Sequence, residues 1–310
     1  MFSVLTEPNY PKAAIGLERE AVTALALQKE GRGQFGVRQA ATIELPKNLL
    51  TPSFFERNIS SPEQFRVLLE EAVVSAGLMN QKNWSVSLPS NTARTAILTL
   101  DNGAAKGETE EILDWKAEQS FGAPSGELRI TRHKISNDGE GRSRHFATAV
   151  KLSVIDEYET IFESLGWTAG LILPRAVSET QWLMRSAERT DSLLLSSQND
   201  GFTAMLLRGD EPAVVRTVTC TQSERDDEIY RLLMFYNDRF ADPHADGLLE
   251  TLLVIGKDLL PAKIKEISNE ALGRTLRVLG AEDVGLNVPV GSLSFDDLAA
   301  PAGLASFGWR

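Results

Sequence analysis

The chain has 310 residues, of which 42% are hydrophobic and 24% charged, and 32 Lys and Arg against 43 Asp and Glu give a formal net charge of −11. This length predicts about two domains with sizeable cores. The acidic balance argues against a nucleic-acid-binding surface, because phosphate contacts need basic residues. The longest uncharged stretch, 298–309, is shorter than the roughly 20 apolar residues that span a bilayer. We expect a soluble, cytoplasmic protein without direct membrane insertion.

The chain begins with three short apolar segments that read as strands. They lie at 13–17, 22–27 and 36–43, and charged or glycine-containing segments separate them. Such spacing is typical of an antiparallel meander.

A helix with clear start and stop signals follows the meander. Ser61 is a candidate N-cap, Pro62 suits the first helical position, and Gln64 fits a capping box. Apolar residues then recur at helical spacing up to Gly77, which is placed to end the helix. The next apolar segment, 84–88, is predicted to be a strand.

Residues from about 90 to 150 form a pattern of their own, which suggests a smaller inserted unit. The elements predicted there are a strand at 95–100, a helix at 108–119 and a hairpin of strands 128–135 and 145–151. A helix at 154–165 and a strand at 169–173 then return to the first pattern.

The second half repeats the order of elements seen in the first half. Its predicted elements are three strands (192–196, 203–207 and 213–219), a long helix (223–240), a strand (251–255) and a helix (261–270). Two halves that each run strand, strand, strand, helix, strand indicate an internal repeat of topology.

Motifs for common catalytic chemistry are absent from the sequence. The histidines, His133, His145 and His244, are scattered, and Cys220 is the single cysteine, so no metal site is predicted. Glu110 and Asp114, four residues apart on a predicted helix, could act as a carboxylate pair. They also fit a solvated helix start, where negative charge favours the helix dipole. We therefore predict no catalytic residues.

The segment Trp115-Lys116-Ala117-Glu118-Gln119, with Phe121 and Pro124 behind it, resembles the W-E-A-E-Q-[YF]-[IL]-P run of the type IV pilus assembly protein PilM family. The segment 146–151, the Pro174-Arg175-Ala176 stretch and the closing segment 300–305 are similar to further family segments, in the same order. The resemblance covers about 12 to 310.

This resemblance implies an α/β, two-lobed actin-like fold of the sugar kinase, heat-shock ATPase and actin superfamily (ASKHA). Each lobe has a β-β-β-α-β-α core, and a small α+β subdomain is inserted. On this reading 12–90 with 152–190 form the first lobe, 91–151 the inserted subdomain and 191–310 the second lobe. Family members are cytoplasmic and commonly bind ATP between the lobes.

The nucleotide motifs that the family implies are altered in this chain. Gly16 replaces an acid and Glu18 replaces a glycine at the first phosphate turn. Ser196 and Gln198 stand at the same two positions of the second turn, and a glycine triplet becomes Gly256-Lys257-Asp258. A carboxylate at a phosphate turn repels phosphate. We therefore expect no cofactor and no enzymatic activity, although ATP binding, with Lys257 as a possible phosphate contact, stays open as the alternative.

The family also implies a partner, since its members hold the short cytosolic N-terminal peptide of the inner-membrane protein PilN beside the inserted subdomain. We predict an adaptor of a type IV pilus or type II secretion-like machine, peripheral to the inner membrane, that holds such a peptide extended in a groove. The candidate groove residues are Ile97, Leu98, Ile112, Trp115 and Phe121. They could equally be core residues of the inserted unit. An active ATPase or kinase, a filament-forming protein and a homo-oligomer are the other readings.

Overall fold

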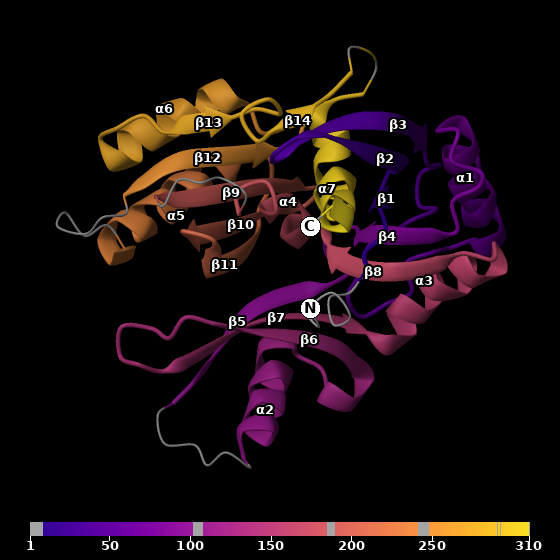
Figure 1. Ribbon diagram of the computed structural model, residues 1–310. Helices are drawn as coiled ribbons and strands as arrows, with labels where there is room; N and C mark the ends of the chain where they lie inside the picture. Colours follow the sequence, from indigo (N-terminus) through magenta and orange to yellow (C-terminus); the bar gives the residue numbers. More distant parts are fainter. Residues whose placement is uncertain are drawn as a thin grey trace, which may run out of the picture. The chain divides into compact units, whose positions relative to one another are not determined.

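The computed structural model describes residues 9–101, 108–184, 190–240, 248–289, 291 and 293–309; His244 lies outside these ranges. Contacts divide the chain into two units. The first contains the described residues of Met1–Thr92, Ser153–Ser178 and Gly285–Arg310, and the second those of Ala93–Leu152 and Glu179–Val284. Each unit is built on its own large sheet (Figure 1).

The sheet of the first unit has the order β14-β3-β2-β1-β4-β8. Its strands are β1 (Ala13–Glu18), β2 (Ala21–Gly31), β3 (Gln34–Glu44), β4 (Asn83–Leu88), β8 (Thr168–Pro174) and β14 (Leu286–Asn287). The predicted meander is confirmed, because β1, β2 and β3 pair antiparallel in sequence order. The first five residues of β1 are all buried, which indicates that helices cover both faces of the sheet at this strand.

The helices of the first unit are α1 (Pro62–Ser75), α3 (Leu152–Ser164), α4 (Arg175–Thr180) and α7 (Phe295–Ala305), followed by the short η3 (Ser306–Trp309). α1 begins as predicted: Ser61 is the N-cap, its side chain accepts from the Gln64 N–H, and Pro62 opens the helix. α1 and α7 lie on opposite faces of the sheet (Figure 1).

The large sheet of the second unit has the order β11-β10-β9-β12-β13. Its strands are β9 (Asp191–Gln198), β10 (Gly201–Arg208), β11 (Glu211–Thr219), β12 (Leu249–Ile255) and β13 (Arg277–Leu279). Helices α5 (Arg225–Phe240) and α6 (Pro261–Leu272) pack on it around a buried core that includes Leu193, Phe202 and Leu233. If the strands of each large sheet are numbered along the chain from the first strand of its meander, both sheets have, apart from β14, the order third-second-first-fourth-fifth. The predicted duplication is therefore confirmed.

A smaller sheet, β5-β7-β6, belongs to the second unit by contacts. It consists of β5 (Arg94–Leu100), β6 (Leu128–Ile135) and β7 (Ser143–Lys151), with α2 (Thr109–Phe121) and η2 (Ser125–Glu127) between β5 and β6. The sheet is linked to β11, because the Arg144 guanidinium donates to the Ala213 carbonyl (2.9 Å).

The C-terminal segment makes its contacts mainly with the first unit. Contacts group 285–310 with the first unit, where α7 lies against β1, β2 and β4. Most of α7 is buried all around, so its sequence carries no face that would assign it to one sheet rather than the other. The domain boundaries themselves stay a prediction.

A buried polar cluster ties the segment before α1 to α3. The Asn58 side-chain oxygen accepts from the Thr92 hydroxyl (2.8 Å) and the Tyr158 hydroxyl (3.0 Å), while its amide nitrogen donates to the Ser53 carbonyl (2.8 Å). Burial raises the pKa of Tyr158, so the phenol stays protonated and donates. The cluster links the irregular segment before α1 to Thr92 and to α3.

Replacing Tyr158 with phenylalanine should lower the free energy of unfolding by about 1 kcal/mol, because one buried hydrogen bond is lost while the ring remains. Urea denaturation of both proteins measures this difference. Tyr230→Phe on α5 is the matched control, since among the described residues no hydrogen bond is recorded for its hydroxyl. Equal stability of Tyr158→Phe and the wild-type protein would contradict a structural role for this bond.

Candidate functional site

The first phosphate turn predicted from the sequence is a tight hairpin. Glu18 pairs with Ala21, so only Arg19 and Glu20 lie between β1 and β2. Gly16, two residues earlier, is buried, and a Cβ atom added there would lie 2.9 Å from Cγ of Pro301 on α7. That distance is too short for a relaxed contact. The place of the acid that the family resemblance implies is therefore filled by a packed helix.

Glu18 points to a partner within the protein. Its carboxylate forms an ion pair with Arg175, the first residue of α4 (Nη1–Oε2 3.1 Å), whose side chain is only 11% exposed. The position that would need glycine for close approach of phosphate thus carries a carboxylate held by a nearly buried cation. The guanidinium is thus already matched by a carboxylate of the protein, and the side chain at position 18 occupies the place where glycine would let a phosphate approach the backbone.

The second turn is equally tight. Gln198 pairs with Gly201 and leaves Asn199 and Asp200 between β9 and β10. Ser196 is fully buried, and the buried Gln198 side chain donates to Thr203 Oγ1. Both side chains at the predicted phosphate positions therefore face the protein interior.

The third turn lies at the end of β12 and is held against the second by side chains. Gly256 has φ +132, and an added Cβ would lie 2.2 Å from Cβ of Ser197, so the two turns touch here. Asp258 accepts from the Ser197 hydroxyl and forms an ion pair with Arg225, the first residue of α5. Lys257 is exposed at the turn.

Arg225 is the central group of this contact. Its side chain is 4% exposed, and besides Asp258 it reaches the Gln198 carbonyl (3.3 Å). Burial raises the pKa of Asp258, but the hydrogen bonds from Ser197 and Arg225 and the charge of Arg225 outweigh this, and its pKa lies below the usual value. The polar groups that a bound ligand would contact at the second and third turns are thus paired with other residues of the protein.

The residues predicted to hold a partner peptide fall into two groups by exposure. Leu98 (2% exposed) and Phe121 (0%) are buried in the core between α2 and the small sheet. Ile97 and Ile112 are half-buried, whereas Trp115 is 58% exposed on α2. Trp115 is therefore the member of this set that a partner can reach most readily, and a role for the set in binding stays a prediction.

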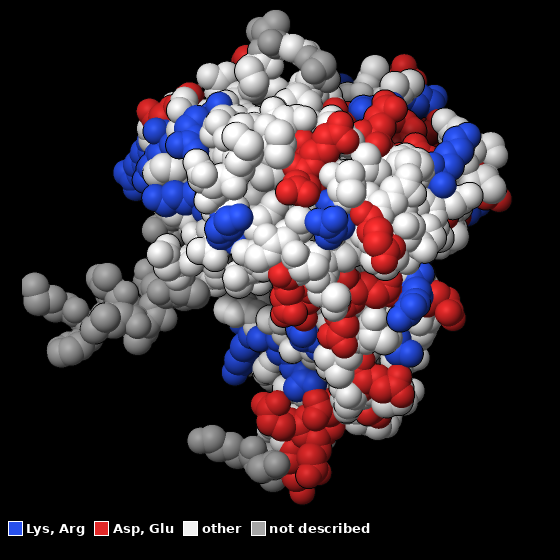
Figure 2. All heavy atoms as spheres, turned by 90° about the vertical axis from the view of Figure 1, so that its right-hand side faces the viewer, with Lys and Arg blue, Asp and Glu red and all other residues white. Residues whose placement is uncertain are grey.

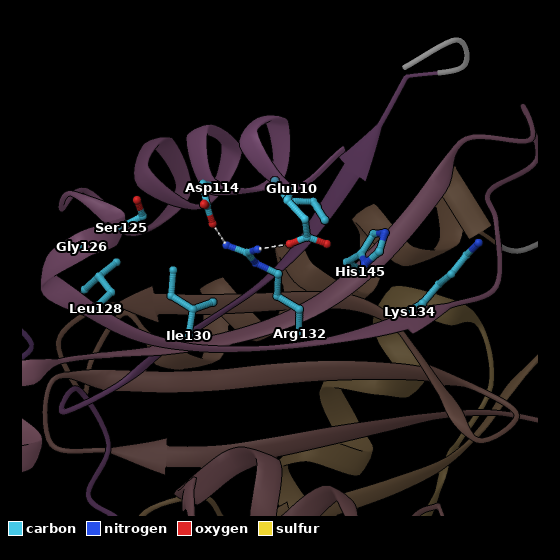
Figure 3. Close-up of a pocket in the computed structure, with 10 residues that line it drawn as sticks. Glu110, Asp114, Ser125, Gly126, Leu128, Ile130, Arg132, Lys134 and His145 are labelled. Atoms are coloured by element: carbon cyan, nitrogen blue, oxygen red, sulfur yellow. Dashed lines mark hydrogen bonds and ion pairs between the residues drawn. The ribbon is translucent and has the colours of Figure 1, made fainter. Parts of the chain in front are cut away.

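An open groove of about 740 Å³ lies between α2 and β6 (Figure 3). Its lining residues are Glu110, Leu113 and Asp114 of α2, Ser125 and Gly126 of η2, Leu128, Ile130, Arg132 and Lys134 of β6, and His145 of β7. The β6 members are alternate residues, because side chains two apart share one face of a strand. None of the lining residues was predicted from the sequence to bind a partner, although the alternate spacing of the four β6 residues is visible there.

Arg132 crosses this groove. It forms ion pairs with Glu110 (3.2 Å) and Asp114, the two acids that the sequence marked as a possible carboxylate pair. Both acids thus share one cation, Arg132, which favours a structural role over acid–base chemistry. The other end of the groove is fixed by Glu118, which accepts from the Ser125 N–H (2.8 Å) and hydroxyl (2.9 Å). The hydrogen bond from the Ser125 backbone N–H has the larger effect and that from its hydroxyl the smaller, and together they hold the pKa of Glu118 below its usual value.

The polar end of the groove carries charges of both signs, Glu110 and Asp114 against Arg132 and Lys134. Burial, together with the charges of Lys134 and Arg132, lowers the pKa of His145, while Glu110 acts in the opposite direction. His145 is therefore neutral near pH 7. The first turn of α2 carries Glu111 besides the groove residue Glu110, and Figure 2 shows acidic side chains gathered at the lower end of the visible face.

The described residues contain neither a candidate metal site nor a candidate membrane span. No group of three or more His, Cys, Asp or Glu side chains is placed to hold a metal ion there. No helix in the described ranges is both long and apolar enough to cross a bilayer.

Comparison with known proteins gives a likeness in structure alone. No protein-family model and no curated protein matches the sequence. A chain of the solved PilM-PilN type IV pilus biogenesis complex superposes with a TM-score of 0.77 at 15% identity, over 98% of this chain and 100% of that one.

Two other solved structures are more distant. A protein of unknown function with an actin-like ATPase fold from Bacteroides thetaiotaomicron has a TM-score of 0.45 at 11% identity, over 96% of this chain and 98% of its own. The ethanolamine utilization protein EutJ from Carboxydothermus hydrogenoformans has a TM-score of 0.46 at 10% identity, over 97% and 91%.

The full-length likeness to the PilM-PilN chain confirms the predicted fold. Together with the duplicated strand order, it shows a two-lobed actin-like α/β architecture of the PilM type. The sequence resemblance to the PilM family is thus matched at the level of fold.

Proposed function

We propose that this protein is a cytoplasmic, actin-like adaptor of a type IV pilus or type II secretion-like assembly machine. It binds the cytosolic N-terminal peptide of a PilN-like inner-membrane protein and stays peripheral to the membrane through that partner. The observation that carries the proposal is the full-length likeness in fold to a chain of the PilM-PilN complex. The W-K-A-E-Q segment at 115–119 supports it from the sequence.

The adaptor works without ATP hydrolysis. Phosphoryl transfer needs a carboxylate that positions Mg²⁺ or the attacking water, and backbone amides that approach the phosphates. At the first turn the carboxylate position is Gly16, which is packed against Pro301, and Glu18 pairs with Arg175. At the other turns Ser197, Arg225 and Asp258 bind one another. These contacts support an adaptor over an ATPase or kinase.

The test is binding of a synthetic peptide with the sequence of the cytosolic N-terminal segment of a PilN-like inner-membrane protein from the same organism. We expect saturable binding in calorimetry, and no binding of the same peptide with its residues scrambled. The same protein should show no thermal shift with ATP and Mg²⁺, whereas a ligand at about 100 times its Kd adds about 2.7 kcal/mol to stability. Absence of peptide binding would refute the adaptor, and a large ATP shift would favour the ATPase.

A further inference from the structure

Strand β3 of the first unit has a free edge over about half of its length. β14 pairs with β3 only at Phe35 and Gly36, and among the described residues no strand lies beside 39–44 (Figure 1). Residues 39–43 are half-buried and contain neither a charge nor a proline, two features that protect an edge strand from pairing. This part of β3 can therefore accept another strand.

The pairing of β3 with β2 determines which backbone groups point to the free edge. The Leu45 N–H donates to the Glu20 carbonyl (2.8 Å), and in an antiparallel ladder hydrogen-bonded pairs alternate with non-bonded ones. Counted back along the register, the backbone groups of Ala40, Thr42 and Glu44 therefore point outward. The hydroxyl of Thr42 lies 2.8 Å from the hydroxyl opposite it on β2, which fits a non-bonded pair, where side chains are closer.

The two ends of the free edge carry opposite charges. Arg38 lies at one end and Glu44 at the other, both are exposed, and neither forms an ion pair with another described residue. A second copy of β3 placed parallel and in register would bring like charges together, whereas an antiparallel copy brings each arginine to a glutamate. With a two-fold axis at Ala41, residue 38 of each copy lies opposite residue 44 of the other. The edge is thus complementary to itself in charge.

Neighbouring elements limit the length of such a contact. β14 occupies the edge at one end, and at the other the chain turns at Pro46, whose carbonyl accepts from the Leu49 N–H (3.1 Å). The register of β3 against β2 shifts by one residue at Arg38, so backbone pairing should end at Gln39 and Arg38 should contribute through its side chain. A contact of this size is typical of weak association, and we expect a dimer that depends on concentration.

We propose that two copies of this protein form a symmetric dimer in which their β3 edges pair antiparallel over 39–43. Ala41 lies at the two-fold axis, and the outward backbone groups of Ala40 in one copy bond to those of Thr42 in the other. An ion pair between Arg38 of one copy and Glu44 of the other closes each end. This inference goes beyond the proposed function and does not depend on the partner peptide.

Sedimentation equilibrium of the full chain over a range of concentrations measures the dimer. Arg38→Glu places two carboxylates together at each end of the contact, and we expect the dimer Kd to rise at least ~10-fold. Glu44→Arg should have the same effect. The double variant Arg38→Glu, Glu44→Arg should restore the dimer, because each pair forms again with its charges exchanged. Arg32→Glu, at an exposed residue between β2 and β3, is the matched control and should stay within about twofold of the wild-type Kd.

The backbone pairing is tested separately from the charges. Ala40→Pro removes an outward N–H and leaves the bonds to β2 in place, so the dimer should be lost while circular dichroism shows a folded protein. In the wild-type protein, hydrogen exchange at high and low concentration gives a readout that needs no variant. The amides of Ala40 and Thr42 should become protected on dimerisation, whereas those of Ala41 and Ile43 already bond to β2 and should not change.

Two results would overturn this inference. One is a protein that stays monomeric at about 1 mM, the weak end of specific association. The other is a dimer that forms equally well with Arg38→Glu and Ala40→Pro, or that protects amides outside β3, since the copies would then meet through another surface. Either result leaves the adaptor proposal in place, because that proposal is tested by peptide binding.

Discussion

Replacing Gly16 with aspartate should destabilise the protein by about 3 kcal/mol or more and should not create ATP binding. The change restores the acid that the family resemblance places at the first phosphate turn. In this protein, however, the position is buried, and the new Cβ would lie 2.9 Å from Cγ and 3.0 Å from Cδ of Pro301. The carboxylate would also enter a packed interface between β1 and α7 as an unpaired charge.

Three further variants separate these causes, with stability measured by urea denaturation. Gly16→Ala adds the Cβ atom alone and reports the steric part, about 1–3 kcal/mol for overpacking. Pro301→Ala removes the Cγ and Cδ atoms that the new side chain would meet, and the double variant Gly16→Ala, Pro301→Ala should recover most of the loss. Pro301 lies inside α7, so Pro301→Ala alone is the reference for the double variant.

The result that would contradict this argument is a stable Gly16→Asp protein whose melting temperature rises with ATP and Mg²⁺. It would mean that α7 moves away from β1 easily and that a single residue separates this chain from nucleotide binding. The non-enzymatic proposal would then lose its main physical support.

Much of the fold could be predicted because local signals agree with the final structure. The Ser61 cap and Pro62 mark the start of α1, and alternation within short apolar segments marks the hairpin of β6 and β7. The repeated order of elements identified the duplicated sheet. Such signals lie within about ten residues of each other, so one sequence carries them in full.

The contacts that define the sites could not be predicted, since they join distant positions. Arg225 and Asp258 are 33 residues apart and meet because α5 begins beside the end of β12. The groove combines a helix, a 3-10 turn and two strands. The burial of Leu98 and Phe121 likewise depends on how α2 lies on its sheet. Apolar character alone gave no way to distinguish such core residues from a binding surface.

The ion pair between Arg225 and Asp258 should matter more for stability than an exposed pair such as Lys263 and Glu266. Asp258→Ala leaves the guanidinium of Arg225, which is 4% exposed, without its carboxylate. Breaking a buried pair typically costs 3–5 kcal/mol, and because Asp258 is 37% exposed we expect about 3 kcal/mol, the lower end. Urea denaturation at pH 7 measures the loss, which ATP should not reverse.

Matched variants show whether the buried charge is the cause. Ser197→Ala removes one hydrogen bond to Asp258 and should cost about 1 kcal/mol. Glu266→Ala removes the carboxylate of an exposed pair with Lys263 and should cost less than about 1 kcal/mol. Adding Arg225→Met to Asp258→Ala should return part of the stability, because no charge is then left buried.

The pH dependence gives an independent measure of the same contact. The pKa of Asp258 is lower in the folded protein than its ordinary value, so the ionised carboxylate stabilises the fold above the unfolded-state pKa, and this stabilisation is lost as the pH falls through the folded-state pKa. The stability difference between the wild-type protein and Asp258→Ala should therefore be greatest near neutral pH and shrink in acid. A difference that stayed constant down to the acid range would mean that the carboxylate charge contributes nothing. The second and third turns would then be held together by packing between Gly256 and Ser197, and their closure would give no reason to exclude a nucleotide.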